Sequence, residues 1–341
     1  MTPARWPRGD ALSERLLVVD PRSQRLRDSL IRDLPQFLRR GDLLVVNDAA
    51  TLAASLLGRG PGGAPIEARL LGTSPRGGFR AVLFGGGDWR TPTENRDPPI
   101  PLALGSRLHF AELSAVVEWI SPSSTRLVEL HFDREGAELW SALYRVGRPV
   151  QYSYTAAPLE LWHVQVGYAS RPWAAEMPSA GRPLRWELLS SLVRAGVCLA
   201  AVTHAAGLSS TGDAALDRAL PLAEHFEIPP ATVSAVSATR ARGGRIVAVG
   251  TTVVRALEGA AAQHAGSLVA GAGETDLVLG PDHHRQIADG LLTGVHQPTA
   301  SHYALLRAFA PADLLARAGS YSDRAGYLCH EFGDSWLLLA S

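Results

Sequence analysis

The sequence predicts an α/β protein, with a mixed α/β barrel-like main domain into which a small all-β barrel domain is inserted. Three observations support this class. Short apolar runs alternate with helically spaced segments in the first and last parts of the 341-residue chain. Between these parts, Gly and Pro become frequent and short strand-like runs recur. The length is enough for two domains. We therefore predict a main domain of residues 1–56 plus 148–341 and an inserted β-barrel domain of residues 57–147.

The first segment contains two predicted strands separated by a helix. Glu14 to Asp20 has the apolar, β-branched character of a strand, and Ser29 to Arg40 spaces its apolar residues as a helix does. Asp42 to Asn47 is then a strand of the kind that is buried on both faces. The polar pair Asn47-Asp48 follows directly, so it is either a candidate site or a loop cap made by the two side chains.

The inserted part is predicted to be a barrel because its strands are short and are separated by turn residues. A loop rich in Gly and Pro, residues 85–101, divides this part of the chain. Its predicted strands are Ile66–Leu71, Phe79–Phe84, Arg107–Phe110, Ala115–Ile120 and Arg126–Phe132.

A long aromatic loop follows residue 148 and extends to Gly181, and structureless stretches of this length in compact domains are usually functional. The spacing then predicts a helix from Trp186 to Ala195 and a buried strand from Val197 to Thr203. We expect Cys198 to be a buried small hydrophobe in that strand. His204 stands at the carboxyl end of the strand, where open α/β sheets bind ligands, although a lone histidine is more often structural.

The stretch from Gly243 to Glu258 predicts a turn, a buried strand, a second turn and a helix. We expect Thr251 or Thr252 to cap that helix, whose N-terminus offers unpaired N–H groups to an anion. Arg255 and Glu258 lie three apart on one helical face, so they either contribute to a site or pair with each other. The plainer alternative is an ordinary βα unit of the core.

The other predicted elements flank this stretch. Glu224, His225 and Glu227 are interpreted as a polar binding loop, because a third ligand for a metal is missing at helical spacing. The predicted elements are a helix over Ala231–Arg242, a strand over Glu274–Leu279, a segment Ile287–Thr293 that leads to His296, a helix over His302–Phe309, and a last strand after the Gly333-Asp334 turn.

Composition narrows the class of protein. With 33 basic and 33 acidic residues the formal net charge is zero, which argues against strong non-specific binding of nucleic acid but leaves a local basic patch open. Every basic residue is arginine, so no lysine acts as a base or forms a Schiff base. Cys198 and Cys329 have no CxxC partner, so a structural zinc site is unexpected.

No apolar stretch is long enough to span a membrane and residues 1–10 have no signal-peptide core, so we expect a cytoplasmic protein without a membrane partner.

No standard catalytic motif is present, since a GxGxxG after the first strand, a P-loop, a GxSxG and an HExxH are all missing. What remains is a set of polar groups placed after buried strands. This set indicates a site for a polar ligand but does not name a reaction. Its members are Asn47, Asp48, His204, Thr251, Thr252, Arg255, Glu258, His296 and Asp334.

Six segments, in order along nearly the whole chain, carry a resemblance. They are Ser13–Asp20, Arg40–Asp48 (RGDLLVVND), Ala248–Glu258 (AVGTTVVRALE), Glu274–Asp276 with Gly280-Pro281, Asp289–Pro298 (DGLLTGVHQP) and Gly333-Asp334. Together they resemble the S-adenosylmethionine:tRNA ribosyltransferase-isomerase family of queuosine biosynthesis, and the chain is identified as a divergent member. The β insert falls where that family has its second, barrel-like domain.

The departures from the family pattern lie in loops. Met177–Leu184 (MPSAGRPL) stands where the family has APTAGLHF, and His204–Asp213 (HAAGLSSTGD) stands where it has HxGxGTF. Ser55 replaces an expected arginine, and Gly294-Val295 replaces Asn-Phe. Because the core strands are kept while the loops change, the divergence concerns the tRNA substrate more than the fold.

The resemblance implies transfer and isomerisation of the ribosyl part of S-adenosylmethionine onto the 7-aminomethyl-7-deazaguanine base of tRNA. The product is epoxyqueuosine, with release of adenine and methionine, and S-adenosylmethionine is the co-substrate without a metal. The expected base is His204 or His296. The expected donor-binding residues are Asn47, Asp48, Gly250, Thr251, Thr252, Arg255, Glu258 and Asp334. The alternatives are a paralogue that uses S-adenosylmethionine on a small-molecule acceptor, and a binding protein without activity.

Overall fold

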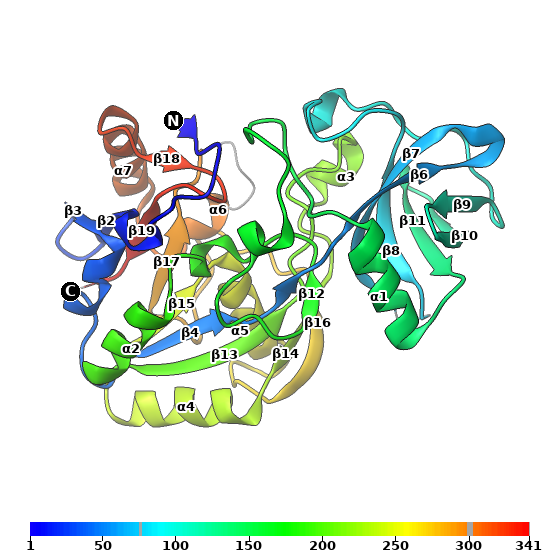
Figure 1. Ribbon diagram of the computed structural model, residues 1–341. Coiled ribbons are helices and arrows are strands. Elements are labelled where there is room, and N and C mark those ends of the chain that lie inside the picture. The colour runs from blue at the N-terminus through cyan, green and yellow to red at the C-terminus, as the bar shows by residue number, and fades with distance from the viewer. Residues whose placement is uncertain (75–76, 299–302, 341) are drawn as a thin grey trace.

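The computed structural model describes residues 1–74, 77–298 and 303–340. Two lobes lie side by side (Figure 1): the larger contains an extended sheet with helices and both ends of the chain, and the smaller contains a barrel. The predicted fold class, an α/β protein with an inserted all-β barrel, is confirmed. The domain boundaries at residues 57 and 147 stay a prediction, although the first barrel strand already begins at Ser55.

The large sheet is mixed and has four parallel strands at its centre. In their order across the sheet the strands are β16 (Gly271–Thr275), β14 (Glu224–Ile228), β13 (Cys198–His204), β4 (Leu43–Asn47), β15 (Ile246–Val249), β17 (Gly290–Gly294), β19 (Ser335–Leu338), β2 (Arg15–Asp20) and β3 (Arg25–Leu30). Parallel pairing places Leu43 opposite both Cys198 and Ile246. The strands β13, β4, β15 and β17 therefore all end at one edge of the sheet, which we call the carboxyl edge.

Helices cover both faces of this sheet, because its central strands are mainly apolar and their side chains alternate between the two faces. Leu43 and Val45 of β4 belong to the core on one face, which also contains residues of the helices α4 (Pro230–Ala241), α5 (Thr251–Gln263), α6 (Tyr303–Leu306) and α7 (Ala312–Arg324). Leu44 and Val46 point the other way and pack against α2 (Trp186–Arg194) and the short 3-10 helix Ile31–Gln36. The strand β4 is thus fully enclosed, and its end can hold polar groups in fixed positions.

The smaller lobe is a closed barrel of antiparallel strands. Around the barrel the order is β10 (Leu113–Ser121), β11 (Ser124–Phe132), β8 (Phe79–Phe84), β7 (Pro65–Thr73), β6 (Ser55–Arg59) and β9 (Arg107–Phe110). The helix α1 (Gly136–Val146) packs against it, with the Trp140 ring 5.7 Å from that of Phe79. The remaining short elements are β1 (Thr2–Pro3), β5 (Ala50–Thr51), β12 (Pro172–Ala174), α3 (Ala214–Arg218) and β18 (Leu328–Cys329).

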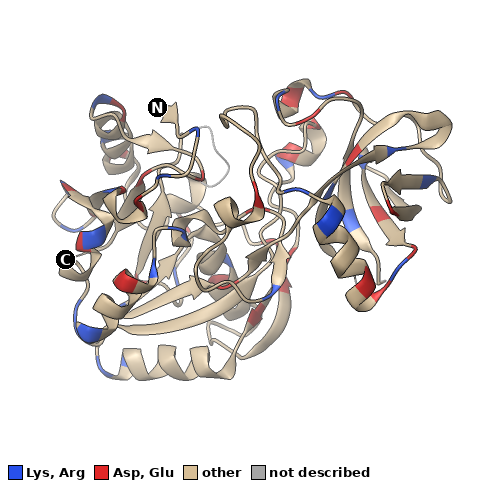
Figure 2. Ribbon diagram, viewed as in Figure 1, with Lys and Arg blue, Asp and Glu red and all other residues tan. Residues whose placement is uncertain are grey.

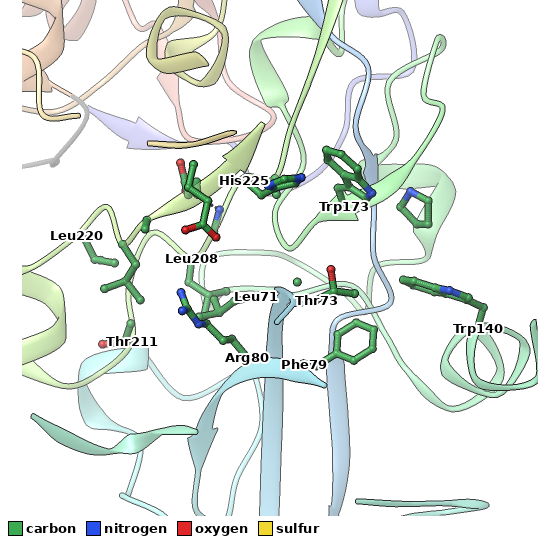
Figure 3. A pocket seen from close by; sticks show the side chains of 18 residues that line it. Leu71, Thr73, Phe79, Arg80, Trp140, Trp173, Leu208, Thr211, Leu220 and His225 are labelled. Carbon is green, nitrogen blue, oxygen red and sulfur yellow. Dashed lines mark hydrogen bonds between the residues drawn. The ribbon is translucent and has the colours of Figure 1, made fainter. Parts of the chain in front are cut away.

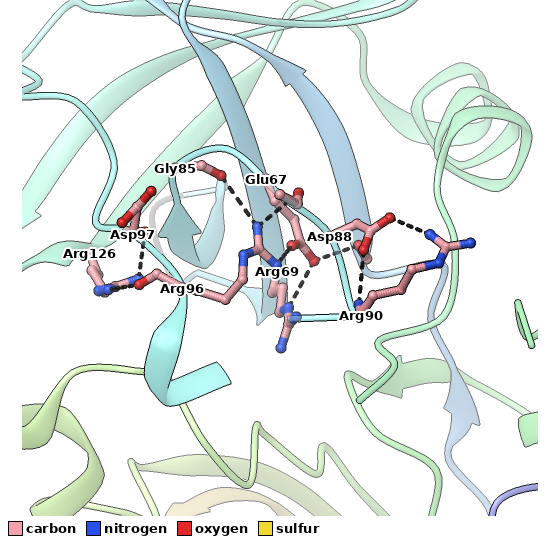
Figure 4. A network of polar contacts seen from close by, with 10 residues as sticks. Glu67, Arg69, Gly85, Asp88, Arg90, Arg96, Asp97 and Arg126 are labelled. Carbon is pink, nitrogen blue, oxygen red and sulfur yellow. Dashed lines mark hydrogen bonds and ion pairs between the residues drawn. The ribbon is translucent and has the colours of Figure 1, made fainter. Parts of the chain in front are cut away.

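A buried ionic network fixes the Gly- and Pro-rich loop to the barrel (Figure 4). Glu67 of β7 accepts from Arg69 Nε at 2.8 Å and from Arg96 Nη1 at 2.6 Å. Arg126 of β11 in turn donates to the backbone carbonyl of Arg96 at 2.8 Å. Because removing one partner would leave a buried charge uncompensated, this network holds the loop in one place despite its irregular backbone.

Several local predictions are wrong. Residues 29–40 do not form one helix, because the end of β3 and a 3-10 helix occupy this stretch and Pro35 has no N–H for an α-helical bond. The predicted strand over Glu274–Leu279 lies earlier, as β16 ends at Thr275. Residues 224–227 belong to strand β14 rather than to a loop. Cys198 is exposed, because it lies at the open start of β13.

The helix predicted over His302–Phe309 is shorter in the structure. His302 lies outside the described residues, and the helix that is described there spans Tyr303–Leu306. In the described parts of the chain, no helix has the length and apolar character that crossing a membrane requires.

Candidate active site

Most of the polar residues singled out from the sequence converge on the carboxyl edge, whereas Glu258 binds the segment that leads into the opposite end of β17. Asn47, His204 and Gly250 end or directly follow β4, β13 and β15, and His296 follows β17 by two residues. β19 runs antiparallel to β17, so Asp334, directly before β19, lies at the same edge. The topology therefore brings together residues that are far apart in the sequence.

Asn47 joins three of these strand ends. Its Nδ2 donates to the carbonyl of His204 at 3.0 Å and to Thr252 Oγ1 at 3.3 Å. Its Oδ1 accepts from the N–H groups of His204 at 2.9 Å and Ala49 at 3.0 Å. The side chain is buried and uses all its hydrogen-bonding capacity within the chain, so it positions the edge.

Asp48 ties the same edge to the aromatic loop. Its carboxylate accepts from Thr203 Oγ1 at 2.6 Å and from Ser170 Oγ at 2.9 Å. Arg171 donates to the same Thr203 hydroxyl at 2.7 Å and also pairs with Glu227 at 2.5 Å. The loop after residue 148 is thus fastened against the ends of β4 and β13.

The start of α5 differs from the prediction that a threonine caps it. Gly250 is the N-cap residue, with φ +90°, and no side chain caps the helix, whose first residue is Thr251. A positive φ of this kind is readily adopted only by glycine. The uncapped N–H groups of the first turn lie beside Asn47, which contacts the Thr252 hydroxyl. The helix start therefore keeps the donors that an anion would use.

His204 is completely buried. Its Nε2 lies 3.4 Å from Glu224 Oε2, but within the described structure neither ring nitrogen has a hydrogen-bond partner of good geometry. Burial, and secondarily the nearby Arg255 charge, lowers the pKa of His204 to about 3. The ring is therefore neutral at pH near 7 and accepts a proton poorly.

Arg255 and Glu258 do not pair with each other. The Arg255 guanidinium pairs with Glu224 and also donates to the carbonyls of Thr275 at 3.2 Å and Leu277 at 3.3 Å. Burial raises the pKa of Glu224, whereas the Arg255 charge opposes that rise. Helical spacing suggested a local pair, but the sheet brings Glu224 of β14 close enough to replace it.

Glu258 anchors the segment that leads into β17. Its buried carboxylate accepts from the backbone N–H groups of Gln286 at 2.7 Å, Ile287 at 3.0 Å and Ala288 at 2.9 Å. The ring Nε2 of His283 lies 3.4 Å away. Three backbone donors on one carboxylate make this a structural clamp.

His296 and Asp334 sit farther along the same edge. The His296 ring is half-buried, and its Nε2 lies 2.8 Å from Thr293 Oγ1 on β17. Asp334 accepts from the backbone N–H groups of Arg15 at 3.0 Å and Leu328 at 2.8 Å, and from the Arg8 guanidinium. Asp334 therefore joins the starts of β2 and β19.

A cavity of about 350 Å³ adjoins this polar cluster where the barrel meets the sheet. Figure 3 shows His225 and Trp173 on one side of it and Phe79 and Arg80 of the barrel on the other. Glu224, which pairs with Arg255, also lines it. Sequence reasoning singled out Glu224 and His225 but missed the cavity, because its two walls come from separate stretches of chain.

Two partly buried acid–tyrosine pairs were missed entirely. The Tyr152 hydroxyl donates to Glu176 and the Tyr154 hydroxyl to Glu331, and the two tyrosine rings stack with centroids 5.9 Å apart. Burial raises the pKa of Glu331 to about 7 and also raises that of Glu176. Only the density of aromatic residues in this loop hinted at them. No group of three or more His, Cys, Asp or Glu side chains in the described structure is arranged to hold a metal ion.

The fold and these contacts define a class first: an α/β protein with an inserted antiparallel barrel and a small-molecule-sized cavity at their junction. Comparison with known proteins then gives the family. Residues 2–338 match the family described as "Queuosine biosynthesis protein". The chain belongs to this family.

Relatives with a named function are similar over nearly the whole chain. The S-adenosylmethionine:tRNA ribosyltransferase-isomerase of Synechococcus elongatus is 34% identical over 95% of this chain and 89% of its own length. The enzyme of the same name from Anaeromyxobacter dehalogenans is 35% identical, over 96% and 92%. The crystal structure of S-adenosylmethionine tRNA ribosyltransferase from Thermotoga maritima matches with a TM-score of 0.54 and 26% identity, over 99% of this chain and 96% of that one.

Proposed function

We propose that the protein transfers and isomerises the ribosyl part of S-adenosylmethionine onto the 7-aminomethyl-7-deazaguanine base of tRNA. Epoxyqueuosine forms in the tRNA, and adenine and methionine are released. The observation that carries the proposal is the full-length likeness to relatives named for this reaction, at 34–35% identity. The convergence of the candidate residues on one edge, beside a cavity, supports it independently.

The reaction needs a base, because the sulfonium of the donor makes the neighbouring C5′ proton removable. A general base works best when its pKa lies near the working pH. His296 is the better candidate, since it is half-buried near the end of β17, with its Nε2 2.8 Å from the Thr293 hydroxyl. His204, the other candidate, is buried and has a pKa lowered to about 3, chiefly by that burial. We therefore rank His204 as the second candidate for the base, because its ring is neutral and lies beside Glu224.

The donor is assigned to the carboxyl edge. The first turn of α5, Gly250 to Thr252, offers N–H groups and the positive end of the helix dipole to the methionine carboxylate. Asn47 and Asp48 hold the neighbouring loops in place for it. Arg255, Glu258 and Asp334 support the site indirectly, because each is occupied by contacts within the chain.

The tRNA assignment rests on the relatives rather than on charge. In the ribbon of Figure 2, arginine and acidic residues are interspersed over both lobes, in keeping with the net charge of zero. The smaller acceptor that the loop changes suggested has no support from the two relatives described above, which are named for tRNA. It remains an outcome of the test.

The test is incubation with S-adenosylmethionine, with and without unmodified tRNA, followed by measurement of free adenine and methionine. We expect release that depends on tRNA carrying 7-aminomethyl-7-deazaguanine, and that persists in the presence of a metal chelator. His296→Ala should lower the rate by about 10²-fold or more. Release that is supported by a small amine but not by tRNA would refute the assignment of tRNA as the acceptor. Full activity in both His296→Ala and His204→Ala would refute the assignment of the base to these histidines.

A further inference from the structure

The cavity between the barrel and the sheet has the character of a site for a flat heterocycle. Its walls are mainly apolar and aromatic, with Glu224 and His225 of β14 on one side and Thr73 and Arg80 of the barrel on the other. Trp173 and Trp140 border it, together with Phe79 of the barrel. Aromatic walls with a small number of placed polar groups are typical of small-molecule sites, and rings of this kind bind nucleobases by stacking.

Glu224 gives the cavity a fixed acceptor. Its Oε1 accepts from the N–H of Gly207 at 2.7 Å, and its Oε2 pairs with Arg255. These contacts hold the carboxylate in one orientation and compensate its charge, while each oxygen keeps a further lone pair. Glu274, the other carboxylate that lines the cavity, is exposed, so water competes for it.

A carboxylate held in this way selects among nucleobases. A guanine-type ring presents two adjacent donors, the ring N–H and the exocyclic amine, and both can be accepted by one carboxylate. An adenine ring presents its amine beside a ring acceptor, and that acceptor would face the carboxylate without a hydrogen. A buried polar group left without a partner costs far more than a missing apolar contact.

We infer that this cavity binds the acceptor base, with Glu224 accepting the adjacent N–H donors of its guanine-type edge and the barrel forming the opposite wall. This inference rests on the proposed function and assigns one part of its site. The donor then lies at the first turn of α5, on the far side of the Glu224–Arg255 pair. The barrel contributes through Thr73 and Arg80 of β7 and β8, so it is part of the binding site.

Filling the cavity tests the assignment without touching the buried ion pair. Thr73 lies at the end of β7, exposed and on the cavity wall, so Thr73→Trp places an indole there with little strain on the barrel. Leu57→Trp is the matched control, because Leu57 is an exposed barrel residue outside the cavity. Glu224→Gln is the second variant; it keeps the volume and replaces an acceptor with a donor.

The measurement is binding of two synthetic anticodon stem–loop RNAs, one carrying 7-aminomethyl-7-deazaguanine and the other adenine at the same position. S-adenosylmethionine binding is measured alongside. We expect wild type and Leu57→Trp to prefer the first RNA, and Thr73→Trp and Glu224→Gln to lose about tenfold or more of that preference. Donor affinity should change less than about twofold in Thr73→Trp.

Two results would overturn this inference and leave the proposed function standing. One is an unchanged preference in both Thr73→Trp and Glu224→Gln. The other is a loss of donor affinity in Thr73→Trp with base preference intact, which would assign the cavity to the donor. A wild-type protein that releases no adenine with either RNA and prefers neither would overturn the proposed function as well.

Discussion

Replacing Asn47 by alanine should destabilise the protein strongly, because one side chain holds the ends of β4 and β13 and the start of α5. The change leaves two buried backbone groups without their partner, the N–H of His204 and the N–H of Ala49, whereas the His204 carbonyl keeps the Ala206 N–H as a donor at 3.0 Å. At about 1 kcal/mol for each such N–H group, the loss is about 2 kcal/mol. This is a large share of the roughly 5–15 kcal/mol that stabilises a typical domain.

The assay is denaturant unfolding of the purified variant, followed by tryptophan fluorescence and circular dichroism. Asp48→Asn is the matched control, since it changes the next residue at a half-buried position where Thr203 can still donate to the remaining oxygen. We expect the control to lose less than about 1 kcal/mol. If Asn47→Ala loses no more than Asp48→Asn, the N–H groups of His204 and Ala49 are satisfied in another way and the reasoning fails.

Two further variants test other parts of the edge. Gly250→Ala should lower the free energy of unfolding by about 1–3 kcal/mol and weaken S-adenosylmethionine binding, because φ is +90° at this position. The control is Gly319→Ala in α7, which should be neutral or stabilising because an added Cβ meets nothing within 4 Å. Equal unfolding midpoints of the two variants would contradict this reasoning. Burial raises the pKa of Glu331 to about 7, so the folded state holds an extra proton between pH about 4.5 and 7 and loses stability as pH rises through that window. Glu331→Gln removes this loss, so its stability relative to wild type should increase from about pH 5 to about pH 8, as measured by denaturant unfolding; a pH-independent difference would refute the assignment.

Elements whose signal is local were predictable from the sequence. β8 and β9 coincide with the predicted runs Phe79–Phe84 and Arg107–Phe110, because alternating apolar residues and flanking turn residues define barrel strands within a few positions. The central strands were equally clear, since a strand enclosed on both faces must be apolar throughout, as Leu43–Asn47 is until its last residue. Convergence at the carboxyl edge followed from their parallel order.

Contacts between distant segments were not predictable. Arg255 pairs with Glu224, 31 positions away, because β14 lies antiparallel beside β13 and brings its first residue to the edge. No spacing in the sequence encodes that register. The same holds for Tyr154 and Glu331, which are 177 positions apart, and for the cavity wall that the barrel supplies. Periodicity reports which face of an element is buried, but not which element covers it.

The polar candidate residues divide into two kinds by what they contact. Asn47, Glu258 and Asp334 bind mainly backbone groups, and each holds strand ends or loops in place. Glu224 lines the cavity, and His296 is half-buried. A group that binds substrate or moves a proton must reach the substrate, whereas a group enclosed by backbone contacts can only position others. Substitution at the first kind should therefore lower stability and activity together, and His296→Ala should lower activity while the unfolding midpoint changes little.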